Sequence, residues 1–344
     1  MESDKLNIAV IGASSMGLSH MKGVVNNKNA NLFAVCDTDT QALAAAKEKY
    51  DVPVAVADYR ELVSSNDVDA VIIVTPDQLH LEMTAAFLRA GKHVLCEKPM
   101  ALNVRECEEM MRIQRETGKM LMIGQVCRCT PAFIMAKEIV DSGRIGELFF
   151  VESEYAHNYE HVEGKDSWRK TPERSGFIGG GCHAVDLLRW IAGDPTEVTA
   201  YSNHKCLTEW PTDDCVIGIY KFPGNVIGKV FVSIGCRRDY TMRTVLYGTK
   251  GTIICDNTSP EISLYTTDEP LPDGKVSYTK PQKLPVDINN HNVGAEIDQF
   301  VDALINGKPS PVPPQEGADT VAVCCATVQS AAENSTLTIE YPKI

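Results

Sequence analysis

The chain has 344 residues, 44% of them hydrophobic, and a formal net charge of −13. This length suffices for two domains that each bury a core, and the composition is that of a globular protein. The acidic excess argues against a nucleic-acid partner, because phosphate-backbone binding needs clustered positive charge. No apolar run approaches the length that spans a membrane, so no membrane partner is expected either.

The start of the chain and its cysteines predict the cellular compartment of the protein. Residues 1–5 are polar and lead directly into an apolar run, so we expect no signal peptide and a cytoplasmic protein. The 12 cysteines are scattered, and in a reducing cytosol they should remain thiols. Neither Cys127-Arg128-Cys129 nor Cys324-Cys325 has zinc-site spacing, so no metal is expected.

Residues 6–37 predict a dinucleotide-binding unit of strand, glycine turn, helix and strand. Gly12 permits the tight turn, and Gly17 lets the following helix pack close to the strand. The start of that helix offers N–H groups and a positive dipole end to a pyrophosphate. Ser14 stands where the motif has its middle glycine, and its hydroxyl could bond a phosphate oxygen.

Asp37 ends the second apolar run, about twenty residues beyond the glycines, where a carboxylate can accept hydrogen bonds from a ribose diol. Asp39 is a competing candidate for this role. A carboxylate at this position repels the 2′-phosphate of NADP, and residues 38–40 offer no cation to neutralise it. The sequence therefore predicts NAD as the cofactor.

Strands and helices continue to alternate after Asp37. We expect strands at 70–74, 93–96 and 120–123, and helices at 40–50, 58–64, 81–90 and 105–117. The run 70–74 is continuously apolar, which is typical of a parallel strand buried on both faces. The predicted fold class is α/β, and residues 1–124 form a Rossmann domain with a doubly wound parallel sheet.

Residues 125–344 predict a second α/β domain with an open, largely antiparallel sheet. Its expected strands lie at 148–156, 197–203, 216–222, 226–234 and 244–248, and its helices at 131–141, 184–192, 294–305 and 320–332. Residues 258–290 are predicted to be a long surface excursion, and the C-terminal helices are candidates to pack back on the first domain. An open sheet with one apolar face needs cover, so we expect a homodimer or homotetramer.

Four short motifs together resemble one family. They are the glycine turn, Thr75-Pro76, Glu97-Lys98-Pro99, and the glycine-rich turn that leads to His183 and Asp186. In this combination the chain is similar to the Gfo/Idh/MocA family of glucose–fructose oxidoreductases and inositol dehydrogenases, and the resemblance covers nearly the whole chain. It implies hydride transfer between NAD and a secondary alcohol of a sugar or cyclitol, and a substrate-domain sheet that often packs on another subunit.

The resemblance also assigns cofactor contacts at the ends of the parallel strands. The residues assigned to NAD are Gly12, Ser14, Ser15, Met16, Gly17, Asp37, Thr75, Pro76, His80, Glu97 and Lys98.

Lys98 and His183 are the predicted catalytic pair. Removing hydride from a carbinol carbon requires a base for the hydroxyl proton and a cation beside the developing charge. Lys98 follows a parallel strand, at the edge where such sheets bind ligands, and the resemblance places it beside nicotinamide and substrate hydroxyl. His183 opens a helix whose N-terminus disfavours imidazolium, so the ring can accept a proton; the resemblance makes it the base.

One position departs from the family pattern. Many relatives have an aspartate four residues before this histidine, where this chain has Gly179. The site then works with Lys98 and His183 alone, or another acid or a tyrosine substitutes.

Polar and aromatic residues after the strand 148–156 predict the substrate site. Aromatic faces stack on sugar C–H surfaces, while His and Arg side chains bond hydroxyls. The candidates are Tyr155, His157, Trp168, Arg169 and Asp186, with Arg128 and His291 as weaker ones. The spacing of His157 and His161 would suit a metal on a helix, but the preceding run is typical of a strand.

Three hypotheses for the function remain open at this point. The first is an NAD-dependent dehydrogenase of a sugar, cyclitol or glycoside. The second is an NAD-using enzyme that cleaves a glycoside through transient ring oxidation, and the third is a sensor that binds dinucleotide and metabolite without turnover. Intact Lys98 and His183 argue against the sensor.

Overall fold

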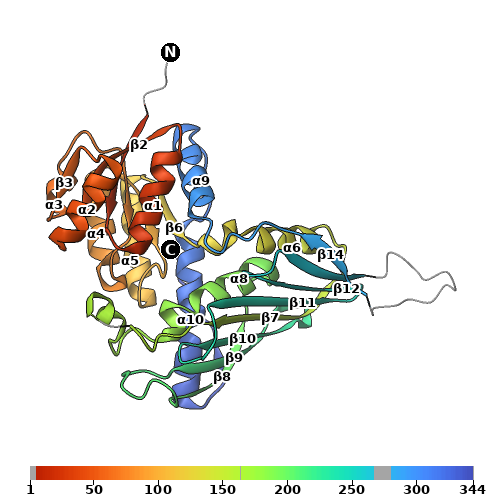
Figure 1. Cartoon of the computed structure of the whole chain (residues 1–344). Coiled ribbons are helices and arrows are strands. Elements are labelled where there is room, and N and C mark those ends of the chain that lie inside the picture. The colour runs from red at the N-terminus through yellow and green to blue at the C-terminus, as the bar shows by residue number, and fades with distance from the viewer. Residues whose placement is uncertain (1–4, 163, 267–279, 344) are drawn as a thin grey trace. The chain divides into compact units, whose positions relative to one another are not determined.

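The computed structural model describes residues 5–162, 164–266 and 280–343, and of residues 164–166 it describes the backbone alone. The chain divides into two compact units (Figure 1). The first comprises Met1–Val126, Asn292–Val321 and Pro342–Ile344, and the second comprises Cys127–His291 and Ala322–Tyr341. The C-terminal segment therefore contributes to both units.

The first unit is a doubly wound sheet. Among the described residues it has six strands in the order β3-β2-β1-β4-β5-β6, and every neighbouring pair is parallel. The strands are β1 (Leu6–Ile11), β2 (Ala30–Cys36), β3 (Val54–Val56), β4 (Ala70–Ile73), β5 (His93–Glu97) and β6 (Leu121–Gly124). The helices are α1 (Ser15–Asn26), α2 (Thr40–Tyr50), α3 (Arg60–Val63), α4 (His80–Arg89), α5 (Val104–Thr117) and α9 (Val293–Ile305). The order confirms the Rossmann fold predicted from the sequence.

Apolar strands form the centre of this unit. All four residues of β4 are buried, as are Val94, Leu95 and Cys96 of β5. A strand covered on both faces needs an apolar residue at every position, which explains the unbroken run in the sequence. The carboxyl ends of β1, β4 and β5 therefore meet at one edge, which carries Gly12, Thr75 and Lys98.

The second unit contains a mixed sheet of nine strands among the described residues, in the order β14-β13-β12-β11-β7-β10-β9-β8-β15. β7 and β10 are parallel, and the other neighbouring pairs are antiparallel. Its strands are β7 (Leu148–Ala156), β8 (Glu197–Asn203), β9 (Cys215–Lys221), β10 (Ile227–Ser233), β11 (Thr241–Gly248), β12 (Gly251–Asp256), β13 (Glu261–Thr266), β14 (Gln282–Pro285) and β15 (Leu337–Thr338).

Helices cover one face of this sheet. They are α6 (Pro131–Asp141), α7 (Gly176–Gly179), α8 (Cys182–Ala192) and the second part of α10 (Pro314–Glu333). α8 contacts β7 and β10, and α6 contacts β12 and β13. The Tyr220 hydroxyl of β9 bonds Thr327 of α10 at 2.8 Å. One face of the sheet is thus the core of the unit.

The expectation of a surface excursion at 258–290 is wrong in part. β13 and β14 lie inside this range, whereas residues 267–279 are outside the described residues. In β13, Ile262 and Leu264 are fully buried at alternate positions. The surrounding Thr, Pro and Asp residues obscured this short alternation. β12 was also missed, although its inward and outward positions alternate in the same way.

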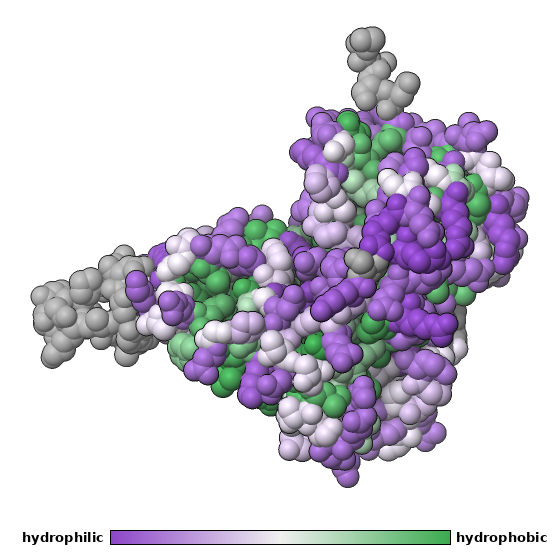
Figure 2. Space-filling view, turned by 180° about the vertical axis from the view of Figure 1, so that it is seen from behind, coloured by the Kyte–Doolittle hydropathy of each residue, from purple (hydrophilic) through white to green (hydrophobic). Residues whose placement is uncertain are grey.

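Within the described residues, no helix combines the length and apolarity needed to cross a membrane. Figure 2 shows one face of the molecule, where hydrophilic side chains predominate and apolar side chains fill smaller areas between them.

The second face of the nine-stranded sheet leads to a prediction about assembly. Ile227 and Ile219 are 48% and 44% exposed, and Ile227 pairs with Phe150 on the same face. We expect this face to pack against a second copy, because burying such side chains is favourable. Ile219→Asp should shift sedimentation toward monomer, whereas Val25→Asp, at an exposed position of α1, should not. A wild-type monomer at micromolar concentration would contradict this prediction.

Candidate functional site

The glycine turn between β1 and α1 leaves no room for a side chain at Gly12 or at Gly17. Gly12 has φ = 111°, and a Cβ there would overlap the carbonyl oxygen of Val74. A Cβ on Gly17 would overlap the carbonyl oxygen of Gly12. Ser14 is the N-cap of α1, and its side chain makes no capping bond. The turn therefore presents backbone and the start of α1, the arrangement that holds a pyrophosphate.

Asp37 braces the glycine turn from the end of β2. Its carboxylate accepts hydrogen bonds from the backbone N–H of Ala13 at 2.6 Å and of Asp39 at 2.8 Å. Asp39 caps α2 by accepting from Gln41 and Ala42. A carboxylate has about four acceptor sites, so Asp37 keeps capacity for a ribose diol, while the Asp39 side chain is engaged in its helix.

His80 joins two strand-end loops. Its buried ring lies 2.9 Å from the carbonyl oxygen of Pro99 through Nδ1 and 3.1 Å from that of Thr75 through Nε2. Both nitrogens must donate to bond two carbonyls, which requires the charged ring. Burial opposes this charge, but Cys96, Asp77 and the Pro99 carbonyl favour it and raise the pKa of His80 to about 10.

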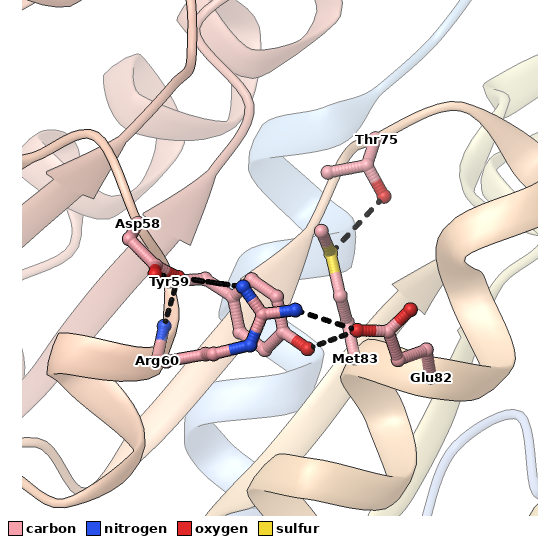
Figure 3. A network of polar contacts seen from close by, with 6 residues as sticks. All are labelled: Asp58, Tyr59, Arg60, Thr75, Glu82 and Met83. Atoms are coloured by element: carbon pink, nitrogen blue, oxygen red, sulfur yellow. Dashed lines mark hydrogen bonds and ion pairs between the residues drawn. The ribbon is translucent and has the colours of Figure 1, made fainter.

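The segment after β4 is also tied to α4, as Figure 3 shows. The Thr75 hydroxyl lies 3.6 Å from the sulfur of Met83. Nearby, the Tyr59 hydroxyl donates to Glu82 at 2.6 Å. Burial and Glu82 raise the pKa of Tyr59 to about 12, so this hydroxyl stays a donor. The first contact holds Thr75 against α4, and the second ties Tyr59, the residue before α3, to the same helix.

Glu97 ends β5 and is a buried acid beside Lys98. Its Oε1 lies 2.8 Å from His20 Nε2, and its Oε2 accepts the Lys98 backbone N–H at 3.0 Å. Burial raises the pKa of Glu97, but the hydrogen bond from His20 and the charges of His20 and Lys98 outweigh it and lower the pKa to about 2. Glu97 is therefore a fixed anion at the strand end that carries Lys98.

His183 is the second residue of α8 in the second unit. Its Nδ1 lies 3.3 Å from Cys127 Sγ, and the same sulfur lies 3.5 Å from Met242 Sδ. Its ring is stacked with that of Tyr155 at 6.1 Å and lies 5.3 Å from that of His291. The histidine is thus held by a thiol and by two rings.

Tyrosines and histidines gather around His183. The Tyr155 hydroxyl lies 2.8 Å from that of Tyr159 and 3.1 Å from His157 Nδ1. The Tyr240 hydroxyl lies 3.1 Å from His291 Nε2. Burial raises the pKa of Tyr155 and of Tyr240 well above the usual value, so these hydroxyls remain protonated. They can therefore donate hydrogen bonds.

The loop after β7 is not helical, since the strand ends at Ala156 and residues 157–158 have no regular structure. His157 and His161 therefore do not share a helix face, and His161 is exposed. The helical spacing that would have favoured a metal site does not arise.

Arg128 and Asp186 form a buried ion pair. The guanidinium donates from Nε at 2.9 Å and from Nη2 at 2.7 Å to the two oxygens of Asp186. Asp186 is fully buried, and the Arg128 side chain is 10% exposed. This bidentate pair joins the segment after β6 to α8, and it directs the Asp186 carboxylate toward Arg128.

Gly179 lies beside a buried cation. The guanidinium of Arg174 occupies the position where a Cβ on Gly179 would fall. Arg174 is 2% exposed, and its guanidinium lies 4.8 Å from the Trp168 ring centre. Arg169 also lies over Trp168, at 4.4 Å. A side chain at position 179 would therefore displace this guanidinium.

Metal-binding residue types meet at two places within the described residues. Cys127, His183 and His291 bring their donor atoms within 4.8 Å of one another in the second unit. His20, Glu97 and Glu296 do so in the first. In both groups two of the three side chains are already within hydrogen-bond distance of each other.

Four residues of these sites were not predicted from the sequence, namely Cys127, Arg174, Tyr240 and Glu296. Cys127 was overlooked because its partners, His183 and Met242, are distant in the chain. Arg174 lies close in the chain to Gly179 and Trp168, but no regular periodicity marks the turn that brings them together. Tyr240 directly precedes β11, and no sequence motif surrounds it. Glu296 did leave a signal, since it shares a helix face with Val293, Ile297 and Phe300, all buried apolar residues. An acid on such a face needs a partner or a proton.

Comparison with known families identifies the class of protein. Residues 6–125 match the family described as "Oxidoreductase family, NAD-binding Rossmann fold", and residues 133–254 match the "GFO/IDH/MocA C-terminal domain". The chain belongs to this oxidoreductase family, as the motifs predicted. Its first unit is an NAD-binding domain, and the overlaps at Gly12 and Gly17 fit a turn shaped for the dinucleotide.

Individual relatives extend over the whole chain. Inositol 2-dehydrogenase of Rhizobium meliloti (strain 1021) is 28% identical over 97% of this chain and 99% of its own. 1,5-anhydro-D-fructose reductase of Ensifer adhaerens is 29% identical over 96% and 98%.

Solved structures show the same fold. An oxidoreductase domain protein from Kribbella flavida has a TM-score of 0.89 at 25% identity and covers 98% of this chain and 100% of its own. A levoglucosan dehydrogenase in complex with NADH has a TM-score of 0.88 at 22% identity, with the same coverage.

The charge on His80 predicts a pH dependence of stability. A group whose pKa is raised on folding contributes stability that is complete below its unfolded pKa, about 6.5, and is lost as pH rises through the folded value. The stability advantage of wild type over His80→Gln should therefore shrink between about pH 6.5 and pH 10. Melting temperatures across this range measure it, and a difference independent of pH would show that the ring is neutral.

The contact between Gly179 and Arg174 predicts coupled mutations. Gly179→Ala should lower the free energy of unfolding by about 1–2 kcal/mol, because it displaces the buried guanidinium. In an Arg174→Ala background the same change should cost less than half as much. Gly294→Ala is the control, since a Cβ there would lie 4.0 Å from Asn292 Oδ1, an ordinary van der Waals contact. Equal costs in both backgrounds, measured by urea unfolding, would contradict the contact.

Proposed function

We propose that this protein is an NAD-dependent dehydrogenase that acts on a secondary alcohol of a sugar, cyclitol or glycoside, with Lys98 and His183 as its catalytic residues. The observation that carries the proposal is the surroundings of His183. This residue lies in the first turn of α8, its Nδ1 lies 3.3 Å from Cys127 Sγ, and its ring stacks on that of Tyr155. The relatives named as inositol dehydrogenase and anhydrofructose reductase support the substrate class.

Cys127 supports the assignment of His183 as base. Met242 sulfur can only accept a hydrogen bond, so the Cys127 thiol donates to it. With the thiol proton on the Met242 side, Cys127 Sγ accepts from His183 Nδ1–H at 3.3 Å. This tautomer leaves Nε2 with its lone pair, able to take a proton from a substrate hydroxyl. Cys127 thereby orients the ring. Position 179 cannot do so, because a glycine there has no side chain.

Lys98 supplies the cation. Its backbone is fixed by Glu97, and its ammonium can stabilise the negative charge that develops on the substrate oxygen. The glycine turn and Asp37 would hold the dinucleotide, with Thr75, Pro76, His80 and Glu97 shaping the edge beside it. NAD⁺, when bound, accepts the hydride that leaves the carbinol carbon.

The substrate contacts are proposed to come from the second unit. Tyr155 and His157 present donors beside His183, and Trp168 presents an aromatic surface. Arg169 lies over that ring, where it can bond a hydroxyl or carboxylate. Arg128 and Asp186 satisfy each other, so we assign them to holding α8 in place.

The test is NADH formation, followed by absorbance, across free sugars, cyclitols, sugar acids and glycosides. With an active substrate, Lys98→Met and His183→Asn should each lower kcat by roughly 10²–10⁴, because charge stabilisation and proton transfer are lost. Lys22→Met, an exposed change on α1, is the control. Unchanged NAD affinity in both variants would show that chemistry, not binding, is affected.

Two results would overturn the proposal. Losses below threefold in both variants would mean that neither residue acts on the substrate. Cleavage of a glycoside without net NADH would favour transient ring oxidation instead.

A further inference from the structure

Three acid–base side chains meet in the interior of the first unit. His20 comes from α1, Glu97 from the end of β5, and Glu296 from the first turn of α9. They are 0%, 6% and 1% exposed, and their donor atoms lie within 4.8 Å of one another. Two carboxyl groups this deeply buried are rare, because charge is costly to remove from water.

The packing of α1 on α9 fixes this cluster. A Cβ on Gly23 of α1 would lie 2.9 Å from Cγ1 of Ile297, the residue after Glu296. One turn further along, Asn27 Nδ2 donates to Asp298 at 2.6 Å. The absence of a side chain at Gly23 lets the two helices approach, and this brings Glu296 to Glu97. The cluster is a consequence of close helix packing.

Hydrogen bonding within the cluster is unequal. Both Glu97 oxygens are engaged, by His20 and by the Lys98 N–H. Within the described part of the chain, neither carboxyl oxygen of Glu296 has a hydrogen-bond partner, and neither does His20 Nδ1. A buried carboxylate with no donor is strongly disfavoured, whereas a neutral acid is tolerated.

The charges around Glu296 act in the same direction. Burial and the negative charge of Glu97 raise its pKa well above the usual value, and Lys98 opposes them only in part. The charged or titratable groups that face Glu296 are His20 on α1, Glu97 on β5 and Lys98 after it. Of two neighbouring acids in unequal environments, the one without hydrogen-bond donors keeps its proton.

We propose that Glu97 and Glu296 form a buried carboxyl pair that retains one proton, with Glu296 as the neutral partner, and that the pair positions Lys98. A single negative charge then faces the Lys98 ammonium, and Glu97 stays free to accept the Lys98 N–H. Glu296 and His20 are positioning residues, because they act on Lys98 through Glu97. The role for Lys98 rests on the proposed function, whereas the shared proton does not.

The proton is tested directly by infrared spectroscopy of the full-length protein. Wild type at pH 7.5 should show the carbonyl stretch of a buried protonated carboxylic acid. Glu296→Gln should lack this band, and Glu48→Gln, at an exposed acid of α2, should retain it. Absence of the band from wild type would overturn the pair, and so would a stoichiometric metal ion in the purified protein.

Stability gives a second readout with a definite sign. The folded chain keeps a proton on Glu296 that the unfolded chain releases above about pH 4.3, so wild-type stability falls with rising pH relative to Glu296→Gln. The melting temperature of the variant minus that of wild type should increase steadily from pH 5 to pH 8. A constant difference would mean that Glu296 is ionised in both states.

The effect on Lys98 is measured without turnover, by the pH dependence of its acetylation followed by peptide mass spectrometry. Glu97→Gln, made in a Glu296→Gln background so that Glu296 cannot ionise in its place, should move the midpoint down by about one pH unit, since an anion is lost. Glu296→Gln replaces a neutral acid by a neutral amide and should leave the midpoint unchanged. A shift of similar size in Glu296→Gln would overturn the assignment of the proton. If the dehydrogenase proposal fails, these three measurements still decide whether the pair exists.

Discussion

The hydrogen bond between His20 and Glu97 is the interaction on which the first unit's site depends. It joins α1, whose start lies at the glycine turn, to the end of β5, which carries Lys98. The same carboxylate accepts the Lys98 N–H, so pyrophosphate-binding turn and candidate cation share one anchor. His80 adds a second anchor through the carbonyls of Thr75 and Pro99. Buried, charge-assisted bonds hold loop ends that apolar packing alone would leave mobile.

In the second unit, a glycine, Gly179, lies four residues before His183, so no acid from that position contacts the histidine. Gly179 leaves room for the Arg174 guanidinium, and Cys127 holds the Nδ1 side of the histidine. A thiol accepts a weaker hydrogen bond than a carboxylate. The ring of His183 is consequently oriented with little added negative charge, and the nearby tyrosines remain donors.

Much of this could be predicted from the sequence, because the decisive signals are local. Gly12, Gly17 and Asp37 mark the nucleotide-binding unit by spacing, and the run 70–74 marks a buried parallel strand. The contacts that link distant segments could not be predicted: Arg128 with Asp186, and Glu97 with Glu296. The contact of Arg174 with Gly179 is local, but it lies in an irregular turn. Such contacts depend on how elements pack, which periodicity does not encode. β12 and β13 were missed because short strands among polar residues carry a weak alternation.

The central claim, hydride transfer from a carbinol carbon to NAD, is tested most directly by isotope transfer. The protein is incubated with NAD⁺ and sugars, cyclitols and glycosides deuterated at their ring carbinol carbons, and the NADH is analysed by mass spectrometry. The account predicts NADH that carries one deuterium with at least one substrate, and none when Lys98 or His183 is replaced. Tight NAD binding with no reduction by any member of the panel would contradict it.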